Sequence, residues 1–423
     1  MVGGARKVKE SAAADAVLAP RPRHRHSRRV MVTQPIWPRL AAADPIAARV
    51  AGTSLTLIEH GPDRLQAILD LIAGAQASLR MLFYMFSNDH SGTAVRDALL
   101  AAIGRGVEVK LLLDGFGSAG TPVEFFQPIS DAGGQFCRFH PRYGRRYLLR
   151  NHQKLVIADD RRALIGGANI QDSYLLGEGP PFWRDLLLAL DGDAVPPASK
   201  YFDAVYRWTT RKGAKLRSLK RLVRRHSDFR GDLQWKFSGP LSLRNPWPAS
   251  IVREICDGCR LDMIAAYFSP PRAMLRRLGH LGRNSGVRII TAAKSDNQAT
   301  IGAARDTYSR LLRSKVEMYE YQPTKLHTKL AIAGDVTYIG SANFDFRSLY
   351  INCEIMLRID HAGFANKMRT YFERELADSL AITPELHKSR ASPLRRLKWR
   401  VSHWLVTSMD YTMARRFNLG AEL

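Results

Sequence analysis

Apolar and polar positions alternate along the first half of the chain in a pattern that predicts strands and helices in succession. Residues 54–58 and 107–113 have strand-like patterns, and residues 79–86 form an apolar strand. Residues 62–77 and 93–105 carry apolar side chains at helical spacing. Strand–helix–strand alternation of this kind favours an α/β domain with a largely parallel core sheet.

The same order of elements recurs in the second half of the chain. Residues 261–268 resemble the strand at 79–86, residues 272–283 repeat the helix, and residues 286–290 resemble residues 106–110. A repeat of this length indicates a duplicated domain rather than a short-period solenoid.

Composition and patterning together divide the chain into five segments. We expect a disordered basic tail over residues 1–45, an N-terminal domain over 46–210, a basic linker over 211–245, a C-terminal domain over 246–385, and a basic amphipathic segment over 386–423.

Each predicted domain carries a copy of one short motif. The first copy contains His152, Lys154 and Asp159 and ends at Gly166-Gly-Ala-Asn169; the second contains His327 and Lys329 and ends at Gly340-Ser-Ala-Asn343. Because strand side chains alternate between faces, the His and the Lys of each copy lie on one face. A hairpin then brings the Asn amide back beside them.

Two such sets have the chemistry that phosphoryl transfer needs. One His attacks phosphorus and forms a phosphohistidine, while the other protonates the leaving alkoxide and then deprotonates the incoming alcohol or water. Two lysines and two amides hold the non-bridging oxygens. Cationic donors can do this without a metal, and the sequence offers no acidic ligand cluster, so we expect neither a metal nor a cofactor.

The hairpin acid differs between the two copies. We include Asp159 among the candidate site residues, although its position assigns it to the hairpin rather than to the attack on phosphorus. Counting from Lys329, the same position falls on Gly334, and Asp335 comes one residue late. We therefore expect activity to survive, with the second half held less rigidly than the first.

The chain is strongly basic, with a formal net charge of +25 and a pI of about 10.3. Such a charge predicts an anionic partner, which could be nucleic acid, a membrane or an acidic substrate, and charge alone cannot choose among them. Cys256 and Cys259 have the spacing of half a zinc site, but no second pair accompanies them, so we expect ordinary reduced thiols. No apolar run approaches the roughly 18 residues that span a bilayer.

Two basic stretches have an apolar stripe at helical spacing. The first, over residues 211–225, carries Leu216, Leu219, Leu222 and Val223; the second carries Leu394, Leu397, Val401, Trp404 and Leu405 among Arg395, Arg396, Lys398 and Arg400. Each is either a solvated surface helix or an interfacial helix on an anionic membrane. The tryptophans Trp399 and Trp404 favour the membrane.

The paired motifs resemble those of the phospholipase D superfamily, and their surroundings are similar to bacterial cardiolipin synthases, most of all the short members without transmembrane helices. The resemblance covers roughly residues 54–380, and the stretches that carry it are 84–89, 106–115, 139–141, 150–152, 183–185, 325–329 and 340–354.

This resemblance implies two duplicated α/β domains, each with a central mixed sheet flanked by helices. It also implies a pseudo-twofold relation between them and one shared active site. An acid from each half would orient the histidine of the other half: Glu354 for His152, and Asp185 for His327.

Our leading hypothesis is a cardiolipin synthase-like phosphatidyltransferase. It would transfer a phosphatidyl group from phosphatidylglycerol or another phospholipid to phosphatidylglycerol. Its partners would be phospholipid substrates and an anionic membrane, and it would lie peripherally on the cytoplasmic face of the bacterial inner membrane.

Other functions remain open at this stage. They are a phospholipase D hydrolase that makes phosphatidic acid, a nuclease of the superfamily, a non-enzymatic membrane scaffold, and a catalytically dead relative. The run from Arg347 to Glu354 favours lipid over nucleic acid as the substrate. The sequence does not predict the oligomeric state, the lipid donor, or which histidine is the nucleophile.

Overall fold

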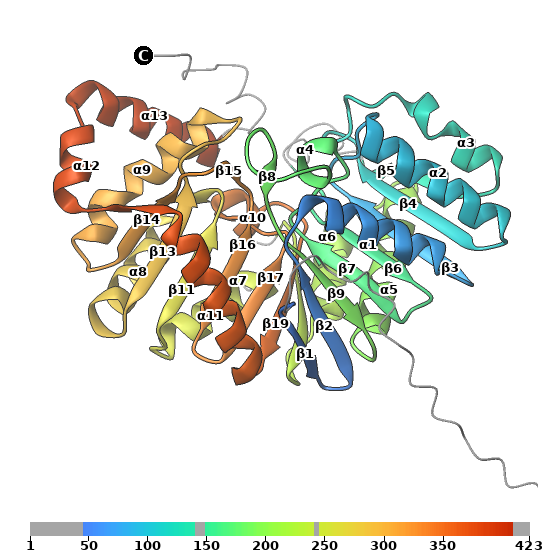
Figure 1. The fold of residues 1–423 in the computed structure, drawn as a ribbon, viewed down its shortest axis with the longest axis horizontal. Helices are drawn as coiled ribbons and strands as arrows, with labels where there is room; N and C mark the ends of the chain where they lie inside the picture. The colour runs from blue at the N-terminus through green and yellow to red at the C-terminus, as the bar shows by residue number, and fades with distance from the viewer. Residues whose placement is uncertain (1–44, 140–148, 241–244, 409–423) are drawn as a thin grey trace, which may run out of the picture. The chain divides into compact units, whose positions relative to one another are not determined.

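Two eight-stranded sheets form the framework of the chain in the computed structural model, which describes residues 45–139, 149–240 and 245–408 (Figure 1). The expected tail over 1–45 lies outside the described residues except for its last residue. The expected mixed α/β class and the duplication are confirmed, because both sheets contain the same succession of strands.

The first sheet has the strand order β1-β2-β9-β7-β6-β3-β4-β5. Its strands are β1 (Ala47–Val50), β2 (Thr53–Ile58), β3 (Ser78–Phe83), β4 (Glu108–Asp114), β5 (Gln135–Phe139), β6 (Leu155–Ala158), β7 (Arg162–Gly166) and β9 (Leu187–Asp191). Only β3, β4 and β5 pair in parallel; every other pairing in this sheet is antiparallel. The prediction of a largely parallel sheet was therefore wrong, because the motif strand β6 turns back as a hairpin.

The second sheet has the order β10-β19-β17-β16-β11-β13-β14-β20. Its strands are β10 (Leu233–Ser238), β11 (Leu261–Ala265), β13 (Val287–Ala292), β14 (Glu317–Tyr321), β16 (Lys329–Ala333), β17 (Val336–Gly340), β19 (Glu354–Asp360) and β20 (Ser379–Ile382). The expected basic linker over 211–245 contributes to this sheet, because β10 lies within it and pairs with β19.

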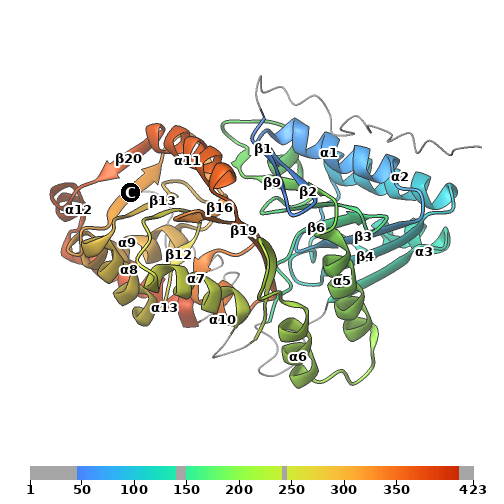
Figure 2. The ribbon, with the colours of Figure 1, turned by 90° about the horizontal axis from the view of Figure 1, so that it is seen from below.

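Helices flank both sheets (Figures 1 and 2), and those at Val195–Thr210 and Ala362–Ala377 contribute side chains to the core between the sheets. The helices are α1 (Gly61–Ala73), α2 (His90–Gly104), the short 3-10 helix η1 (Val123–Phe125), α3 (Gln127–Asp131), α4 (Asp172–Leu175), α5 (Val195–Thr210), α6 (Leu216–His226), α7 (Pro246–Cys256), α8 (Arg272–Asn284), α9 (Gln298–Leu312), α10 (Phe346–Tyr350), α11 (Ala362–Ala377), α12 (Pro384–Arg390) and α13 (Pro393–Ser408). Among the described helices, none is long and apolar enough to cross a bilayer.

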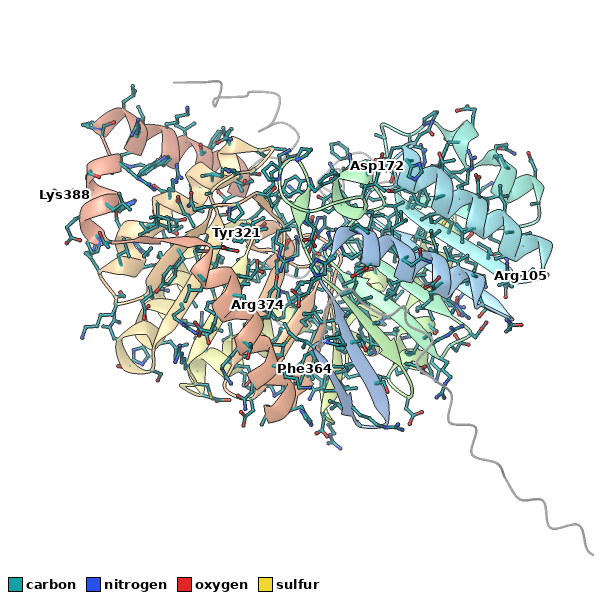
Figure 3. The ribbon with its side chains drawn as sticks, viewed as in Figure 1. Arg105, Asp172, Tyr321, Phe364, Arg374 and Lys388 are labelled. Atoms are coloured by element: carbon teal, nitrogen blue, oxygen red, sulfur yellow. The ribbon has the colours of Figure 1, made fainter. Side chains whose placement is uncertain are left out.

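One hydrophobic core is shared by the two sheets. Alternation along β4 sends Leu111 and Leu113 to the outer core with α1 and α2, whereas Leu112 points into the shared core. Leu330 of β16 lies in that same shared core, as does Phe364 of α11, which Figure 3 marks. The halves therefore bury apolar side chains against each other rather than folding around separate cores.

Short strands also connect the halves. Strand β8 (Trp183–Arg184) pairs in parallel with β15 (Lys325–Leu326), and an isolated bridge joins Asn151 to Cys353. A third ribbon lies within the second half and joins β12 (Phe268–Ser269) to β18 (Phe344–Asp345). The first two connections stand next to the two motif histidines.

Candidate active site

Backbone hydrogen bonds from the opposite half fix the position of each motif histidine. The His152 N–H donates to the Cys353 carbonyl over 2.9 Å, and the Cys353 N–H donates to the Arg150 carbonyl over 2.8 Å. The His327 N–H donates to the Arg184 carbonyl over 2.8 Å in the same way. The duplicated chain thus places both histidines at one junction between the halves.

Each histidine ring contacts a buried carboxylate from the other half. His152 Nδ1 lies 3.1 Å from Glu354 Oε2, and His327 Nδ1 lies 2.6 Å from Asp185 Oδ2. These are the crossed pairs that the sequence resemblance implied. Because Nδ1 faces the acid, Nε2 is the ring nitrogen left for a reaction. The catalytic role of the four residues stays a prediction.

Neighbouring hydroxyl and amide groups hold the two carboxylates. Ser341 Oγ donates to Glu354 Oε2 over 2.5 Å, and Ser348 Oγ donates to Glu354 Oε1 over 2.8 Å. Asp185 Oδ1 accepts the Leu186 N–H over 2.8 Å. Glu354 and Asp185 are fully buried, so these bonds fix the acids before any ligand arrives.

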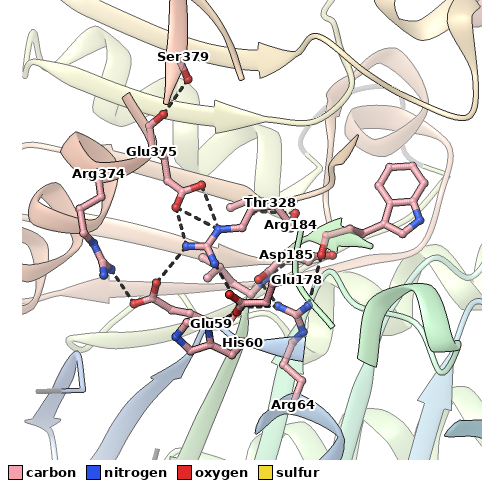
Figure 4. A network of polar contacts seen from close by, with 12 residues as sticks. Glu59, His60, Arg64, Glu178, Arg184, Asp185, Thr328, Arg374, Glu375 and Ser379 are labelled. Carbon is pink, nitrogen blue, oxygen red and sulfur yellow. Dashed lines mark hydrogen bonds and ion pairs between the residues drawn. The ribbon is translucent and has the colours of Figure 1, made fainter. Parts of the chain in front are cut away.

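A polar network lies behind Asp185 (Figure 4). The buried Arg64 guanidinium donates to the Asp185 carbonyl over 2.5 Å and to the Tyr174 carbonyl over 2.7 Å. Arg184 bridges Glu375 and Glu59, at 2.6 Å and 3.1 Å. Since Glu375 belongs to α11 of the second half, this network ties Asp185 to the half that carries His327.

The two motif lysines are buried beside their histidines. Lys154 Nζ donates to the His152 carbonyl over 2.7 Å, and Lys329 Nζ donates to the His327 carbonyl. Burial lowers the pKa of Lys154 to about 7 and that of Lys329 to about 8, and for Lys154 repulsion from Lys329 adds to the effect. Glu354 and Asp185 act in the opposite direction on both lysines.

The histidine pKa values are lowered as well. Burial is the largest cause for His152, and Lys154 and Lys329 add to it against the opposing effect of Glu354. Burial and Lys329 lower the pKa of His327 to about 3. With both histidines neutral, the two acids can balance the two lysines, and a further proton on either histidine would leave the site with excess positive charge. A bound anion would favour the protonated forms of all four bases.

Both histidines line one pocket of about 230 Å³. Asn169 and Asn343 line it too, and the side-chain oxygen of each is buried without a hydrogen-bond partner among the described residues. A ligand group that donates a hydrogen bond to these amide oxygens would remove a cost of burial, and the NH2 group of each amide can donate to a phosphate oxygen. A phosphate ester beside two histidines and two amides fits this arrangement.

Several pocket residues were not predicted as site residues: Tyr84, Phe116, Arg150, Tyr174, Tyr267, Asp296, Asn297 and Asn352. Tyr84 lies 4.9 Å from the His152 ring, and Tyr174 lies 5.1 Å from the His327 ring. Tyr84 and Tyr267 come just after β3 and β11, which pair with the motif strands, and Phe116 and Asp296 follow the next strands, β4 and β13. This position was the available signal, because the ends of neighbouring parallel strands meet at one edge of a sheet.

The structure corrects one predicted site residue, Asp159. It lies at the far end of β6, roughly 20 Å along the strand from His152 at about 3.3 Å per residue. There its carboxylate accepts the N–H groups of Gln76, Ala77 and Ser78. Asp159 closes the hairpin against the start of β3 and does not reach the pocket.

The glycine that replaces this acid in the second copy fits the same turn. Asp159 and Gly334 both have φ of +54°, a left-handed conformation that glycine adopts without strain. A Cβ at Gly334 would lie 3.1 Å from Cys259 Sγ. A side chain at position 334 would therefore require Cys259 to shift by a few tenths of an ångström. The strands of the second hairpin pair in full register.

Known proteins are similar to this chain in sequence and in fold. The family model for "Cardiolipin synthase, PLD-like domain" matches residues 68–179 and 258–376. Cardiolipin synthase A of Pseudomonas aeruginosa (strain LESB58) is 30% identical over 365 residues, which cover 84% of this chain and 73% of the relative. Cardiolipin synthase 1 of Bacillus cereus (strain ATCC 14579) is 29% identical over 346 residues, which cover 78% and 68%.

A solved structure with the same fold is the phosphatidylserine synthase of Haemophilus influenzae Rd KW20. It superposes with a TM-score of 0.64 at 14% identity, over 88% of this chain and 96% of that chain. At that identity the likeness shows the fold alone. The sequence matches extend over both halves and include both motif histidines. The chain therefore belongs to the cardiolipin synthase family of phospholipase D-like proteins.

Proposed function

We propose that the protein is a cardiolipin synthase that transfers a phosphatidyl group between phospholipids through a phosphohistidine. The observation that carries this proposal is a pocket lined by one histidine from each half. The ring of each histidine contacts a carboxylate of the other half. Membership of the cardiolipin synthase family supports the lipid substrate.

The first step forms a bond between His152 Nε2 and the phosphorus of phosphatidylglycerol or another phospholipid. The bond from phosphorus to the headgroup oxygen breaks, and His327 donates a proton to the leaving alkoxide. In the second step the hydroxyl of another phosphatidylglycerol gives its proton to His327. Its oxygen then displaces His152 from phosphorus, and cardiolipin is released.

Exposure favours His152 as the nucleophile. Its side chain is 12% exposed, whereas that of His327 is 4% exposed. The shorter contact of His327 with Asp185 suits a base that must carry a proton between the two steps, since a close carboxylate stabilises an imidazolium. Lys154, Lys329, Asn169 and Asn343 would hold the non-bridging phosphate oxygens.

The surface of α13 supports a peripheral position on an anionic bilayer. Leu394 and Trp404 are 77% and 59% exposed, and Leu397 and Val401 lie exposed between them. The predicted stripe is corrected at Leu405, which is buried, as are Trp399 and Val406. One face of α13 thus packs inward, and the other presents leucines and a tryptophan among basic side chains, as interfacial helices do.

Helix α13 lies near the pocket. An added Cβ on Gly302 of α9 would lie 2.8 Å from Ser402 Oγ of α13, so the two helices are in close contact. Gly302 is about 8 Å along α9 from the pocket residue Asn297, at 1.5 Å per residue. Docking of α13 on the cytoplasmic face of the inner membrane would place the pocket close to its lipid substrates.

Lipid analysis by mass spectrometry tests the proposed reaction. Purified protein is incubated with phosphatidylglycerol vesicles, with and without phosphatidylethanolamine, beside His152→Ala and His327→Ala variants. Cardiolipin that forms only with intact histidines supports the transferase, and its dependence on phosphatidylethanolamine identifies the donor.

Other outcomes of that experiment favour the other functions. Phosphatidic acid without cardiolipin would make the protein a hydrolase with water as the acceptor. No lipid turnover by the folded protein would contradict both lipid reactions and direct the search to nucleic-acid substrates. Vesicle binding that is equal on neutral and anionic lipid would contradict the membrane role.

A further inference from the structure

A second cavity lies away from the active site, between helices α5 and α6. It encloses about 570 Å³ and is larger than the pocket that holds the histidines. Helix α5 lines it with residues spaced three, four and seven apart, and α6 does the same from its side. This spacing places one whole face of each helix against the cavity. We call it the α5–α6 groove.

Positive charge converges on this groove. Lys200 and Arg207 reach it from α5, and Arg221 and Arg225 reach it from α6. Within the described part of the chain, no carboxylate lies at ion-pair distance from any of these four side chains. Four cations around one cavity repel one another, and a bound anion would relieve that repulsion.

The nearby acids have other partners. Asp203 lines the groove but pairs with Arg80 at 3.0 Å. Asp228, just beyond α6, accepts the Trp235 N–H over 3.1 Å. The lining residue His226 lies in the positive electrostatic potential of these cations. Burial is the largest cause of its lowered pKa, and Arg225 and Arg207 lower the pKa further.

The groove is a fixed feature rather than two independent surface helices. Trp208 Nε1 of α5 donates to the Lys215 carbonyl and to Ser218 Oγ at the start of α6, over 3.2 Å and 3.1 Å. Leu219 and Val223 of α6 are buried in the shared core. The apolar stripe of α6 is therefore used in packing, unlike the exposed stripe of α13. The other face of α6 lines the groove with Arg221 and Arg225 on either side of Leu222.

The groove and the active-site pocket have no lining residue in common. Tyr201 of α5 points the other way, where its hydroxyl accepts from Gln153 Nε2 over 2.7 Å. Changes to the arginines of α6 therefore leave the histidine contacts in place.

We propose that the α5–α6 groove binds a phosphate-bearing anion at a site separate from the active site. Arginine forks match the geometry of phosphate oxygens, and a cavity between two helices can surround one or two phosphate groups. The phosphate could belong to the headgroup of an anionic phospholipid or to a free phosphate compound. Binding to vesicles with and without an anionic phospholipid distinguishes the two sources.

The test compares two variants with the same loss of charge on α6. The groove variant is Arg221→Gln with Arg225→Gln. The matched control is Arg217→Gln with Lys220→Gln, two residues of the same helix that do not line the groove. Isothermal titration with inorganic pyrophosphate measures binding to both and to the unchanged protein, and the active site contributes equally to all three.

We expect a second pyrophosphate site in the unchanged protein and in the control. In the groove variant this site should bind at least about tenfold more weakly, because two charge-assisted hydrogen-bond donors to the phosphate are lost. Equal binding by the two variants would overturn the proposal, since the effect would then follow net charge. Titration of the unchanged protein at a single site would overturn it too.

Vesicle sedimentation then identifies the source of the phosphate. The probes are phosphatidylcholine vesicles with and without phosphatidylglycerol. If the groove takes a lipid headgroup, the groove variant binds the anionic vesicles more weakly than the control does. If it takes a free compound, the two variants bind these vesicles equally and differ only toward pyrophosphate.

Discussion

At the scale of single residues, the two halves support their carboxylates differently. Position 341 is a serine that donates to Glu354, whereas the equivalent position 167 is a glycine. A Cβ at Gly167 would lie 2.4 Å from Asp185 Oδ1 and 2.6 Å from Oδ2. Asp185 therefore occupies the space that a side chain would need, and this keeps it 2.6 Å from His327.

We predict that Gly167→Ala lowers kcat by about 100-fold, the size of effect that a 1 Å displacement of a catalytic group produces. The added methyl group must push Asp185 away from His327, so the histidine loses its orientation. Cardiolipin formation measured with saturating phosphatidylglycerol checks this result. Gly104→Ala is the matched control, because no atom lies within 4 Å of a Cβ built there. Unchanged kcat in folded Gly167→Ala protein would contradict the prediction.

The lowered lysine pKa values predict the pH dependence of the free enzyme. A lysine must be protonated to hold a phosphate, and this form is lost as pH rises through about 7 for Lys154 and about 8 for Lys329. The nucleophilic His152 must be neutral, and the lowering of its pKa favours that form. The acid His327 must be protonated, and its pKa, lowered to about 3, makes kcat/KM fall gradually as pH rises above that value. Loss of the lysine protons should make this fall steeper above about pH 7 to 8, well below the ordinary lysine pKa near 10.4.

Measurement of kcat/KM and kcat against pH in neutral detergent micelles checks this prediction. Phosphatidylglycerol does not titrate in this range, so the profile belongs to the enzyme. Because bound phosphate favours the charged lysines, the alkaline limb of kcat should lie at higher pH than that of kcat/KM. If the lysine-dependent loss of both kcat and kcat/KM occurs only near pH 10, the pKa values of Lys154 and Lys329 are not lowered, and the prediction is wrong.

At the scale of elements, two helices with similar sequence patterns have different surroundings. The leucines of α6 face the core, and its basic face lines the α5–α6 groove. In α13, the buried face packs on α9 and α12: Trp399 stacks on His387 of α12 at 5.4 Å, and His403 pairs with Asp306 of α9 at 3.2 Å. Only α13 therefore leaves an apolar stripe exposed.

We predict that Leu397→Gln with Trp404→Gln weakens binding to phosphatidylglycerol-containing vesicles by at least about tenfold, because full burial of each apolar side chain contributes about 1.5–3 kcal/mol. Vesicle sedimentation measures the loss. The control is Phe229→Gln with Leu380→Gln, which removes exposed apolar side chains elsewhere on the molecule. Equal losses in both variants would mean that α13 has no special role at the bilayer.

Sequence patterns predicted the helices and strands better than they predicted which face of each helix is buried. Both hairpins and both Asn positions were predictable because strand alternation and the duplication determine them, whereas the crossed acids were implied by the family resemblance. The burial of Leu405 and the exposure of Leu394 were not, since a helical stripe alone does not say whether it meets protein or solvent. The groove was not predictable either, because it depends on how α5 and α6 pack in three dimensions. The location of Asp159 in the hairpin was predictable from the length of the motif strand. Its inclusion among the candidate site residues was wrong, because its carboxylate binds the start of β3.

At the scale of the whole molecule, the active site requires that two halves of one chain stay together. His152 is held by Glu354 and His327 by Asp185, so neither half contains a complete histidine–carboxylate pair. The shared core supplies the contact energy, with Leu155 and Leu330 on equivalent strands of the two sheets. Separation of the halves would expose this core and disrupt both pairs at once.

This coupling predicts that a cavity in one sheet destabilises the other. Leu330→Ala should lower the free energy of unfolding by about 2–5 kcal/mol, the usual cost of a buried leucine. Hydrogen exchange is measured in β13, a strand of the mutated sheet, and in β4, a strand of the other sheet. Because the halves share one core, protection should fall in both strands by a similar amount.

The control variant Leu380→Ala removes a side chain that is 36% exposed and should change the exchange of neither strand. Faster exchange in β13 with unchanged exchange in β4 would mean that the halves unfold independently. The pocket could then lose its crossed pairs without loss of either fold.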